Sequence, residues 1–163
     1  MAHEDFFLKV DSKKGGAIKG EAQDRDHKDE IDVLGWSWGM SAPTSTSGLR
    51  KGRAAPQQLV IRKETDCAST PLMSALSSND DIKTVVLTAR RAGKGQQTYL
   101  KITLRNAHLT SFEIQGEGGD EGPGTIELVK FAFERIQVDY TPQGPDGQPR
   151  GGTSFEDAWS PTE

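Results

Sequence analysis

The chain has 163 residues with a formal net charge of −4 at pH 7, and 33% of its residues are hydrophobic. This length fits one domain with a hydrophobic core and is short for two. The composition excludes two classes of protein. The chain has no cluster of Lys and Arg of the kind that nucleic-acid-binding proteins have. No apolar run approaches the ~18 residues of a membrane span.

The N-terminus and the single cysteine indicate where the protein is made. The opening stretch MAHEDFFLKVDS has acidic residues and no apolar run of signal-peptide length. Cys67 has no second cysteine in the chain with which to form a disulfide, which fits a reducing compartment. We therefore expect synthesis in the cytosol and, if the protein is exported, a route other than the general secretory one.

Short strands dominate the first part of the chain. FFLKV (6–10) predicts the first strand, and residues 31–41 predict another after a glycine-punctuated stretch. The segment 41–56 is rich in Pro, Ser, Thr and Gly, which predicts an extended surface loop. QQLVIRKET (57–65) alternates apolar and polar residues, as a half-buried strand does.

One helix is predicted, at about residues 70–79 within ASTPLMSALSSND. Thr70 is placed to cap its first turn, and Pro71 then falls at the first helical position. Leu72, Met73 and Leu76 share one face. Because about two turns are not stable alone in water, we expect this helix to pack against the sheet.

The second part of the chain again reads as strands. Residues 82–91 and 96–107 flank a glycine-containing turn, AGKG, and 109–117 continue the second strand. An acidic, glycine-rich turn, GEGGDEGPG (116–124), precedes the longest apolar pattern, at 125–140.

The inward-facing set in residues 125–140 changes parity twice. It runs through Ile126 and Leu128, then Phe131 and Phe133, then Ile136, Val138 and Tyr140. Because side chains alternate with a period of two, each change predicts a bulge or a strong twist. A curved sheet that closes on itself uses such a device.

The tail 141–163 is expected to be loop-like, with Phe155 and Trp159 as its apolar anchors. The chain contains no internal repeat and no sign of a second domain. We therefore predict one all-β domain over 1–163, a compact β-barrel with one short α-helix packed on it.

Candidate catalytic and metal motifs fail on their spacing. His3, His27 and His108 lack ligand partners at metal-binding distances in sequence, and GGDEGPG lacks the alternating Asp/Asn ligands of a calcium loop. The GK dipeptide of AGKG is no phosphate loop, because Gly95 stands where Ser or Thr is required. Cys67 is expected to be a structural thiol. We predict no cofactor and no enzyme.

The stretch DEIDVLGWSWGM (29–40) is the most unusual in the chain. On a strand, Trp36 and Trp38 point to one face and Ser37 to the other. One interpretation places both tryptophans in the core and Ser37 in solvent. The other is a strand with a large apolar face and a small polar face that borders a cavity or channel. The residues alone leave both open.

HKDEIDVLGWSWGMS (27–41) resembles the motif of the haemolysin-coregulated protein (Hcp) family, the tube subunits of type VI secretion systems. FFLKVDS, TDCASTPLMSALSS, YLKITLRNAHLTSF and VKFAFERIQVDYTPQ resemble further segments of that family, in order, over nearly the full chain. The chain differs from the family pattern in a longer first turn, DSKKGGAIKG, and in a basic loop, GLRKGRAAP.

The resemblance implies a structural role. Hcp-like proteins fold as a β-barrel flanked by a helix and assemble into hexameric rings. The rings stack into a tube inside a contractile sheath, below a VgrG-type spike protein, and the ring lumen binds and stabilises effector proteins. The resemblance therefore implies assembly in the cytoplasm followed by secretion through the type VI system, without nucleic-acid binding or membrane insertion.

Particular residues take roles by the same resemblance. Ser37 would lie on the inner wall of the ring, and Trp36 and Trp38 would anchor its strand. The loop 41–56 would extend towards a neighbouring subunit or ring. Its contact residues would be Leu49, Arg50, Lys51 and Arg53.

Two other classes of function remain as alternatives. One is a monomeric β-barrel that binds a flat ligand on Trp36 and Trp38. The other is an enzyme whose acidic residues come together only on folding, for which a pair of perturbed carboxylates in a closed cleft would be the evidence.

Overall fold

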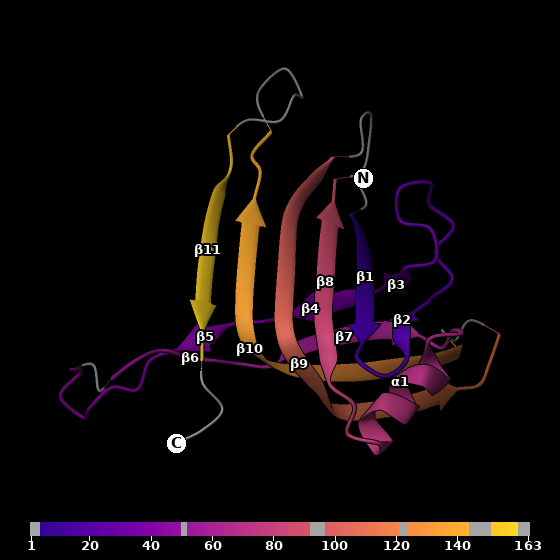
Figure 1. Cartoon of the computed structure of the whole chain (residues 1–163), viewed down its shortest axis with the longest axis horizontal. Coiled ribbons are helices and arrows are strands. Elements are labelled where there is room, and N and C mark those ends of the chain that lie inside the picture. Colours follow the sequence, from indigo (N-terminus) through magenta and orange to yellow (C-terminus); the bar gives the residue numbers. More distant parts are fainter. Residues whose placement is uncertain (1–3, 50–51, 92–96, 121–123, 144–150, 160–163) are drawn as a thin grey trace.

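The computed structural model describes residues 4–49, 52–91, 97–120, 124–143 and 151–159. Arg50, Lys51, His3 and the AGKG turn lie outside these ranges. In chain order (Figure 1) the elements are β1 (Asp5–Ser12), β2 (Gly16–Ile18), β3 (Ile31–Val33), β4 (Gly35–Ser37), β5 (Met40–Ser41), β6 (Ala55–Pro56), β7 (Leu59–Glu64), α1 (Ser69–Ser77), β8 (Ile82–Arg90), β9 (Thr98–Glu117), β10 (Gly124–Tyr140) and β11 (Thr153–Ala158).

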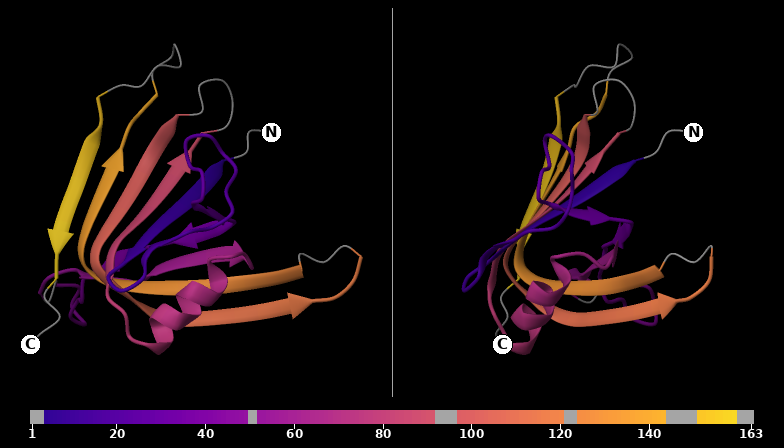
Figure 2. Two further views of the ribbon diagram at one scale, coloured as in Figure 1. Left: turned by 45° about the vertical axis from the view of Figure 1, so that its right-hand side comes forward. Right: turned by 90° about the vertical axis from the view of Figure 1, so that its right-hand side faces the viewer.

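A single sheet folds over on itself into two layers. Its strand order is β2-β1-β8-β9-β10-β7-β4, with β11 paired to β10 and β3 paired to β1. The long strands β9 and β10 bend sharply and belong to both layers (Figure 2). We call the layer with β1, β8 and β11 the β8 layer, and the layer with β4 and β7 the β7 layer.

The hydrophobic core lies between the two layers. Leu8, Ile61, Leu104, Phe131 and Ile136 are among its buried residues, and they come from strands of both layers. The end strands β2 and β4 do not pair with each other in the described part of the chain. The predicted class, a mainly β barrel with one short helix, is confirmed, with the barrel left open.

Backbone irregularities accompany the bend of β9 and β10. Asn106 of β9 has a φ of 51°, which lies in the left-handed region. Lys130 pairs with Ser111 but Phe131 pairs with Leu109, so Thr110 is the extra residue of a β-bulge. The sequence analysis expected an irregularity at each of two places within 125–140; the bulge found here lies opposite that segment, with its extra residue on β9.

The inward face of β10 differs from the prediction. Glu127, Val129 and Phe131 are buried, and the inward parity changes once, before Ile136. The assignment of Ile126 and Leu128 to the core was therefore wrong, because both are only half-buried. The apolar residues of this segment lie on both faces of the strand. The sequence pattern therefore does not show which face points to the core.

The predicted strand 31–41 is interrupted because it passes from one layer to the other. β3 pairs with β1 in the β8 layer, whereas β4 pairs with β7. The crossing occurs at Leu34, which is 44% exposed and donates its backbone N–H to Arg62 O at 2.8 Å. Ile31 and Val33 therefore face the core before the crossing, and the tryptophans do so after it.

The helix is confirmed with a different start and a different face. It begins at Ser69, so Thr70 and Pro71 lie inside the first turn and not at the predicted cap and first positions. Asp66 Oδ1 accepts the Ala68 N–H at 3.0 Å near the start of the helix. Leu72 is fully buried, but Met73 is 36% exposed and does not belong to the packed face.

The C-terminal tail contains a strand that the sequence analysis missed. β11 pairs with β10 from Tyr140↔Thr153 to Arg135↔Ala158. Trp159 packs against the core as predicted, whereas Phe155 is 37% exposed. Polar Ser, Glu and Asp residues around a single phenylalanine gave this strand no clear apolar pattern.

Charged residues are buried beneath the β7 layer. Lys63 and Glu127 are directly opposite in β7 and β10, and both are fully buried. Lys63 Nζ lies 2.7 Å from Glu127 Oε1 and 2.9 Å from Asp66 Oδ1, and it donates to Ser69 Oγ at 3.1 Å. This ion cluster links two strands of the layer to the start of α1.

A second ion cluster fixes the N-terminal edge of the β8 layer. Arg90, which is 3% exposed, donates through Nη2 to Asp24 at 2.8 Å and to Asp5 at 2.9 Å. Its guanidinium lies 5.0 Å from the ring centroid of Phe7, and His27 stacks on Phe7 at 4.3 Å. The segment that carries Asp24 and His27 is thereby held over β1.

Replacing Lys63 by Met should lower the free energy of unfolding by about 3–5 kcal/mol, because Glu127 is left buried without its cation. The double variant Lys63→Met/Glu127→Leu should recover most of that loss, because apolar side chains replace both charges. Urea unfolding followed by tryptophan fluorescence measures both effects. A double variant less stable than Lys63→Met alone would contradict this account.

Removing the Asp24 carboxylate should change the acid sensitivity of the fold. The hydrogen bond from Arg90 lowers the pKa of Asp24 from 3.8 to about 2. The stability it contributes is therefore complete above pH 3.8 and is lost as the pH falls towards 2. Thermal midpoints of the native protein and Asp24→Asn should differ near neutral pH and converge in this acid range. Asp26→Asn removes an exposed carboxylate nearby. The difference between its thermal midpoint and that of the native protein should be the same near neutral pH and in this acid range.

Candidate functional site

The β7 layer presents an outward face that no element of the described chain covers. We call it the open sheet face and define it by the outward side chains of β4, β7, β9 and β10. In rows across the sheet these are Ser37, Val60, Lys130 and Ser111; Arg62, Leu128 and Glu113; Glu64, Ile126 and Gln115; and, beyond them, Glu117.

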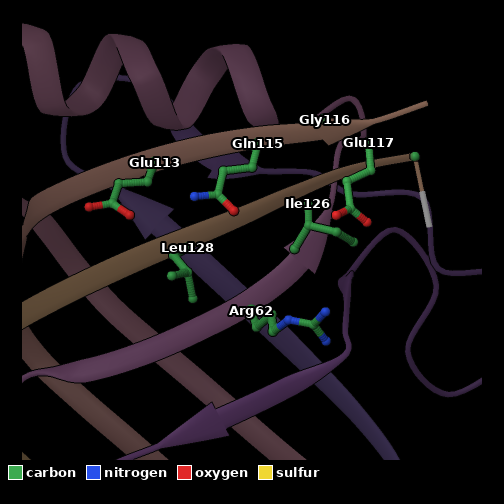
Figure 3. A pocket seen from close by; sticks show the side chains of 8 residues that line it. Arg62, Glu113, Gln115, Gly116, Glu117, Ile126 and Leu128 are labelled. Atoms are coloured by element: carbon green, nitrogen blue, oxygen red, sulfur yellow. The ribbon is translucent and has the colours of Figure 1, made fainter. Parts of the chain in front are cut away.

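A hollow of about 550 Å³ lies on this face (Figure 3). Two half-buried apolar side chains, Ile126 and Leu128, lie in its middle. Glu113 and Glu117 project over it from β9, and Arg62 borders it from β7. The hollow therefore combines a small apolar floor with charged side chains of both signs.

Ser37 lies at the β4 end of the same face. Its side chain is exposed, and it borders a smaller hollow of about 240 Å³ that also touches Arg62 and Leu128. Because these two residues line both hollows, Ser37 and the larger hollow belong to one continuous surface.

The two tryptophans beside Ser37 pack in the opposite direction, against the core. The ring of Trp36 meets Phe6 edge-on, with centroids 6.2 Å apart. Trp38 lies 6.4 Å from Phe133 and donates its indole N–H to Gln57 O at 2.9 Å. Both are only half-buried. Their rings contact aromatic neighbours, so they do not form the flat platform that a ligand-stacking site requires.

The segment predicted as an extended loop is an arm that projects from the barrel (Figure 1). Its base is a short two-stranded ribbon in which Met40 pairs with Pro56 and Ser41 with Ala55. Leu49 near its tip is 70% exposed. An exposed apolar side chain in this position remains consistent with a contact to another molecule.

Arg53, by contrast, contacts its own chain. It forms an ion pair with Asp157, donates to Ala158 O at 2.9 Å, and lies 5.2 Å from the ring centroid of Trp159. The Trp159 indole N–H donates to Ala54 O at 2.9 Å. We call these contacts between the arm base and β11 the arm clasp. In this structure Arg53 positions the arm. Of the two predicted contact residues that the structure describes, Leu49 and Arg53, only Leu49 is available to contact another molecule.

Neither a metal centre nor a membrane-spanning helix is found in the described ranges. No group of three or more His, Cys, Asp or Glu side chains there is arranged to hold a metal ion. None of the helices there is long and apolar enough to cross a membrane. Cys67 is exposed, and its thiol donates to Lys19 O at 3.3 Å; desolvation raises the pKa of this thiol.

Comparison with known proteins gives the family. Residues 7–140 match the model of the family described as "Type VI secretion system effector, Hcp". The chain is 40% identical over 152 residues to the protein hcp1 of Pseudomonas aeruginosa, covering 91% of this chain and 90% of that protein. The chain belongs to the Hcp family.

Solved structures agree with this assignment. "Structure of a type six secretion system protein" superimposes with a TM-score of 0.85 at 26% identity and covers 98% of this chain and 96% of that one. The structure of Hcp1 from Salmonella typhimurium gives a TM-score of 0.76 at 28% identity, with 97% and 95% covered. The Hcp fold, with its strand-rich body and single short helix, is therefore the fold of this chain.

Sequence analysis proposed Ser37 as a site residue and did not identify the other residues of the open sheet face. It gave no role to Arg62, Glu113 or Glu117, and it placed Ile126 and Leu128 in the inward-facing set. The available signal was that Lys63 and Glu127 share the inward parity of Ile61 and Val129. Unless the strand pairing is known, the sequence pattern does not show whether two charged residues at inward positions form a buried ion pair or whether the inward face has been assigned wrongly.

Removing Asp157 from the arm clasp should loosen the arm and leave the barrel folded. Asp157→Asn breaks the ion pair with Arg53, and an exposed pair of this kind contributes about 1 kcal/mol at most. Because cleavage follows the population of the open form, trypsin should cut the arm up to roughly fivefold faster. Glu156→Gln, the adjacent carboxylate on β11, should leave the rate unchanged. Equal rates for both variants would show that the clasp does not hold the arm.

Proposed function

We propose that this protein is the tube subunit of a type VI secretion system, forming hexameric rings that stack into the expelled inner tube. The open sheet face is the wall of the ring lumen, where effector proteins bind and are stabilised. The neighbours of the tube are the contractile sheath and a VgrG-type spike protein. The protein is not an enzyme, and it is assembled in the cytoplasm before the type VI system secretes it.

The observation that carries this proposal is the alternation at residues 36–38. Trp36 and Trp38 pack inward, while Ser37 between them is exposed on a continuous outward face. A serine there leaves a bore open and both donates and accepts hydrogen bonds. These residues lie inside the segment that matches the Hcp family.

Unpaired strand edges support assembly into a ring. β4 is an end strand of the sheet, and in the described part of the chain no strand pairs with the far edge of β9 beyond Ala107. Free edges on the two sides of one layer invite pairing. A head-to-tail contact whose rotation closes would satisfy both edges and produce a ring with the open sheet face inside.

The arm has a place in the same assembly. It projects beyond the barrel (Figure 1) and presents exposed Leu49, and Arg50 and Lys51 follow in the sequence. We infer that it contacts a neighbouring subunit or the next ring, with the arm clasp setting its direction.

The monomeric ligand-binding barrel is the weaker alternative. Its proposed platform, Trp36 and Trp38, packs on Phe6 and Phe133. Among the residues that the structure describes, no comparable observation supports a catalytic site.

Substitutions at Ser37 and Trp38 test the proposal. Light scattering coupled to gel filtration should give a hexameric mass for the 17.7 kDa chain. Ser37→Gln should keep the ring and reduce export of cargo, because only the lumen wall changes. Trp38→Ala should lower the free energy of unfolding by on the order of 3 kcal/mol and damage the ring first. A monomeric native protein would refute the tube. Loss of the ring in Ser37→Gln would show that the assignment of the two faces of the strand is wrong.

A further inference from the structure

The charges around the larger hollow of the open sheet face are unequal in number. Glu113 and Glu117 project over it from the same side of β9, with Gln115 between them (Figure 3). Both carboxylates are exposed. Arg62 is the one cation among the described residues that line the hollow. Lys130 lies further along the face, opposite Ser111. The hollow itself is therefore bordered by an excess of carboxylates.

These side chains remain available to a partner. Within the described residues, no ion pair involves Glu113, Glu117 or Arg62. Lys63 and Glu127, on the other side of the same layer, form an ion pair with each other. The buried pair therefore leaves the negative excess of the hollow uncompensated.

The floor of the hollow adds an apolar contact. Ile126 and Leu128 are half-buried and lie next to each other on the outward side of β10. A hollow of about 550 Å³ is within the size range of pockets that bind small molecules. It admits a long side chain together with a neighbouring aliphatic one.

We propose that this hollow recognises cargo proteins with a basic surface: a Lys or Arg side chain lies between Glu113 and Glu117, and an adjacent aliphatic side chain packs on Ile126 and Leu128. The inference rests on the proposed function, because a ring presents the hollow once in each subunit around one lumen. Each contact alone is weak, but simultaneous contacts by one cargo molecule multiply. An excess of one sign of charge around a bore also attracts partners of the opposite sign.

A different role for these carboxylates would be protection of the strand edge. Charged side chains near an exposed edge discourage aggregation through strand pairing. That role predicts that removing Glu113 and Glu117 changes aggregation and leaves the binding of a basic partner unchanged. Binding measurements on intact rings therefore separate the two roles.

The probes are three fluorescein-labelled peptides of equal length, with Gly-Lys-Leu, Gly-Glu-Leu or Gly-Lys-Ser repeats, titrated against purified rings. The Lys-Leu peptide should bind roughly tenfold more tightly than the Glu-Leu peptide and a few-fold more tightly than the Lys-Ser peptide. Glu113→Gln/Glu117→Gln should weaken Lys-Leu binding roughly tenfold and flatten its salt dependence. Glu156→Gln/Asp26→Asn removes two carboxylates outside the open sheet face and should leave binding unchanged.

Light scattering on the same samples separates the failure of this inference from failure of the proposed function. Rings that bind the Lys-Leu peptide equally in the native protein and in Glu113→Gln/Glu117→Gln would overturn the inference and leave the tube intact. Equal losses in both double variants would assign binding to overall charge and would also overturn it. A native protein that forms no rings would refute the proposed function, and this inference with it.

Discussion

The bend shared by β9 and β10 is the constraint on which the rest of the fold depends. Both strands continue through it, so each layer contains part of each strand (Figure 2). A pleated strand changes its inward parity only where the ladder is irregular. Asn106 in the left-handed region and the extra residue Thr110 supply those irregularities. The two layers therefore enclose one core, and the β7 layer keeps its other face open.

The same change of layer explains the tryptophan-rich segment. At Leu34 the chain leaves the edge of β1 and joins β7. The parity that puts Ile31 and Val33 inward would put Ser37 inward as well, were the segment one continuous strand. The crossing reverses it, so that Trp36 and Trp38 contact the core while Ser37 lies on the open sheet face. The residues on the two faces of this short stretch therefore have different environments: Trp36 and Trp38 pack on the core, and Ser37 is exposed.

The sequence predicts those parts of the fold in which local pattern and burial agree. Alternation in 57–65 located β7. β11 was missed because it is defined by its backbone pairing with β10. Its own residues include few apolar side chains, so they show no strand pattern. Met73 was misplaced because residues on neighbouring positions of a short helix differ greatly in burial once the helix docks. Long-range pairing and docking, which decide these cases, leave no local pattern.

The buried Lys63–Glu127 pair links the register of the β7 layer to the side chains on its outward face. These residues are direct partners in β7 and β10, so a slip by one position would separate two buried charges and turn Arg62 or Leu128 inward. Such a state is disfavoured by the desolvation of the unpaired ions. The pair therefore contributes register specificity as well as packing. It fixes the alternation in which Arg62, Ile126 and Leu128 face outward, and with it the apolar floor beneath Glu113 and Glu117.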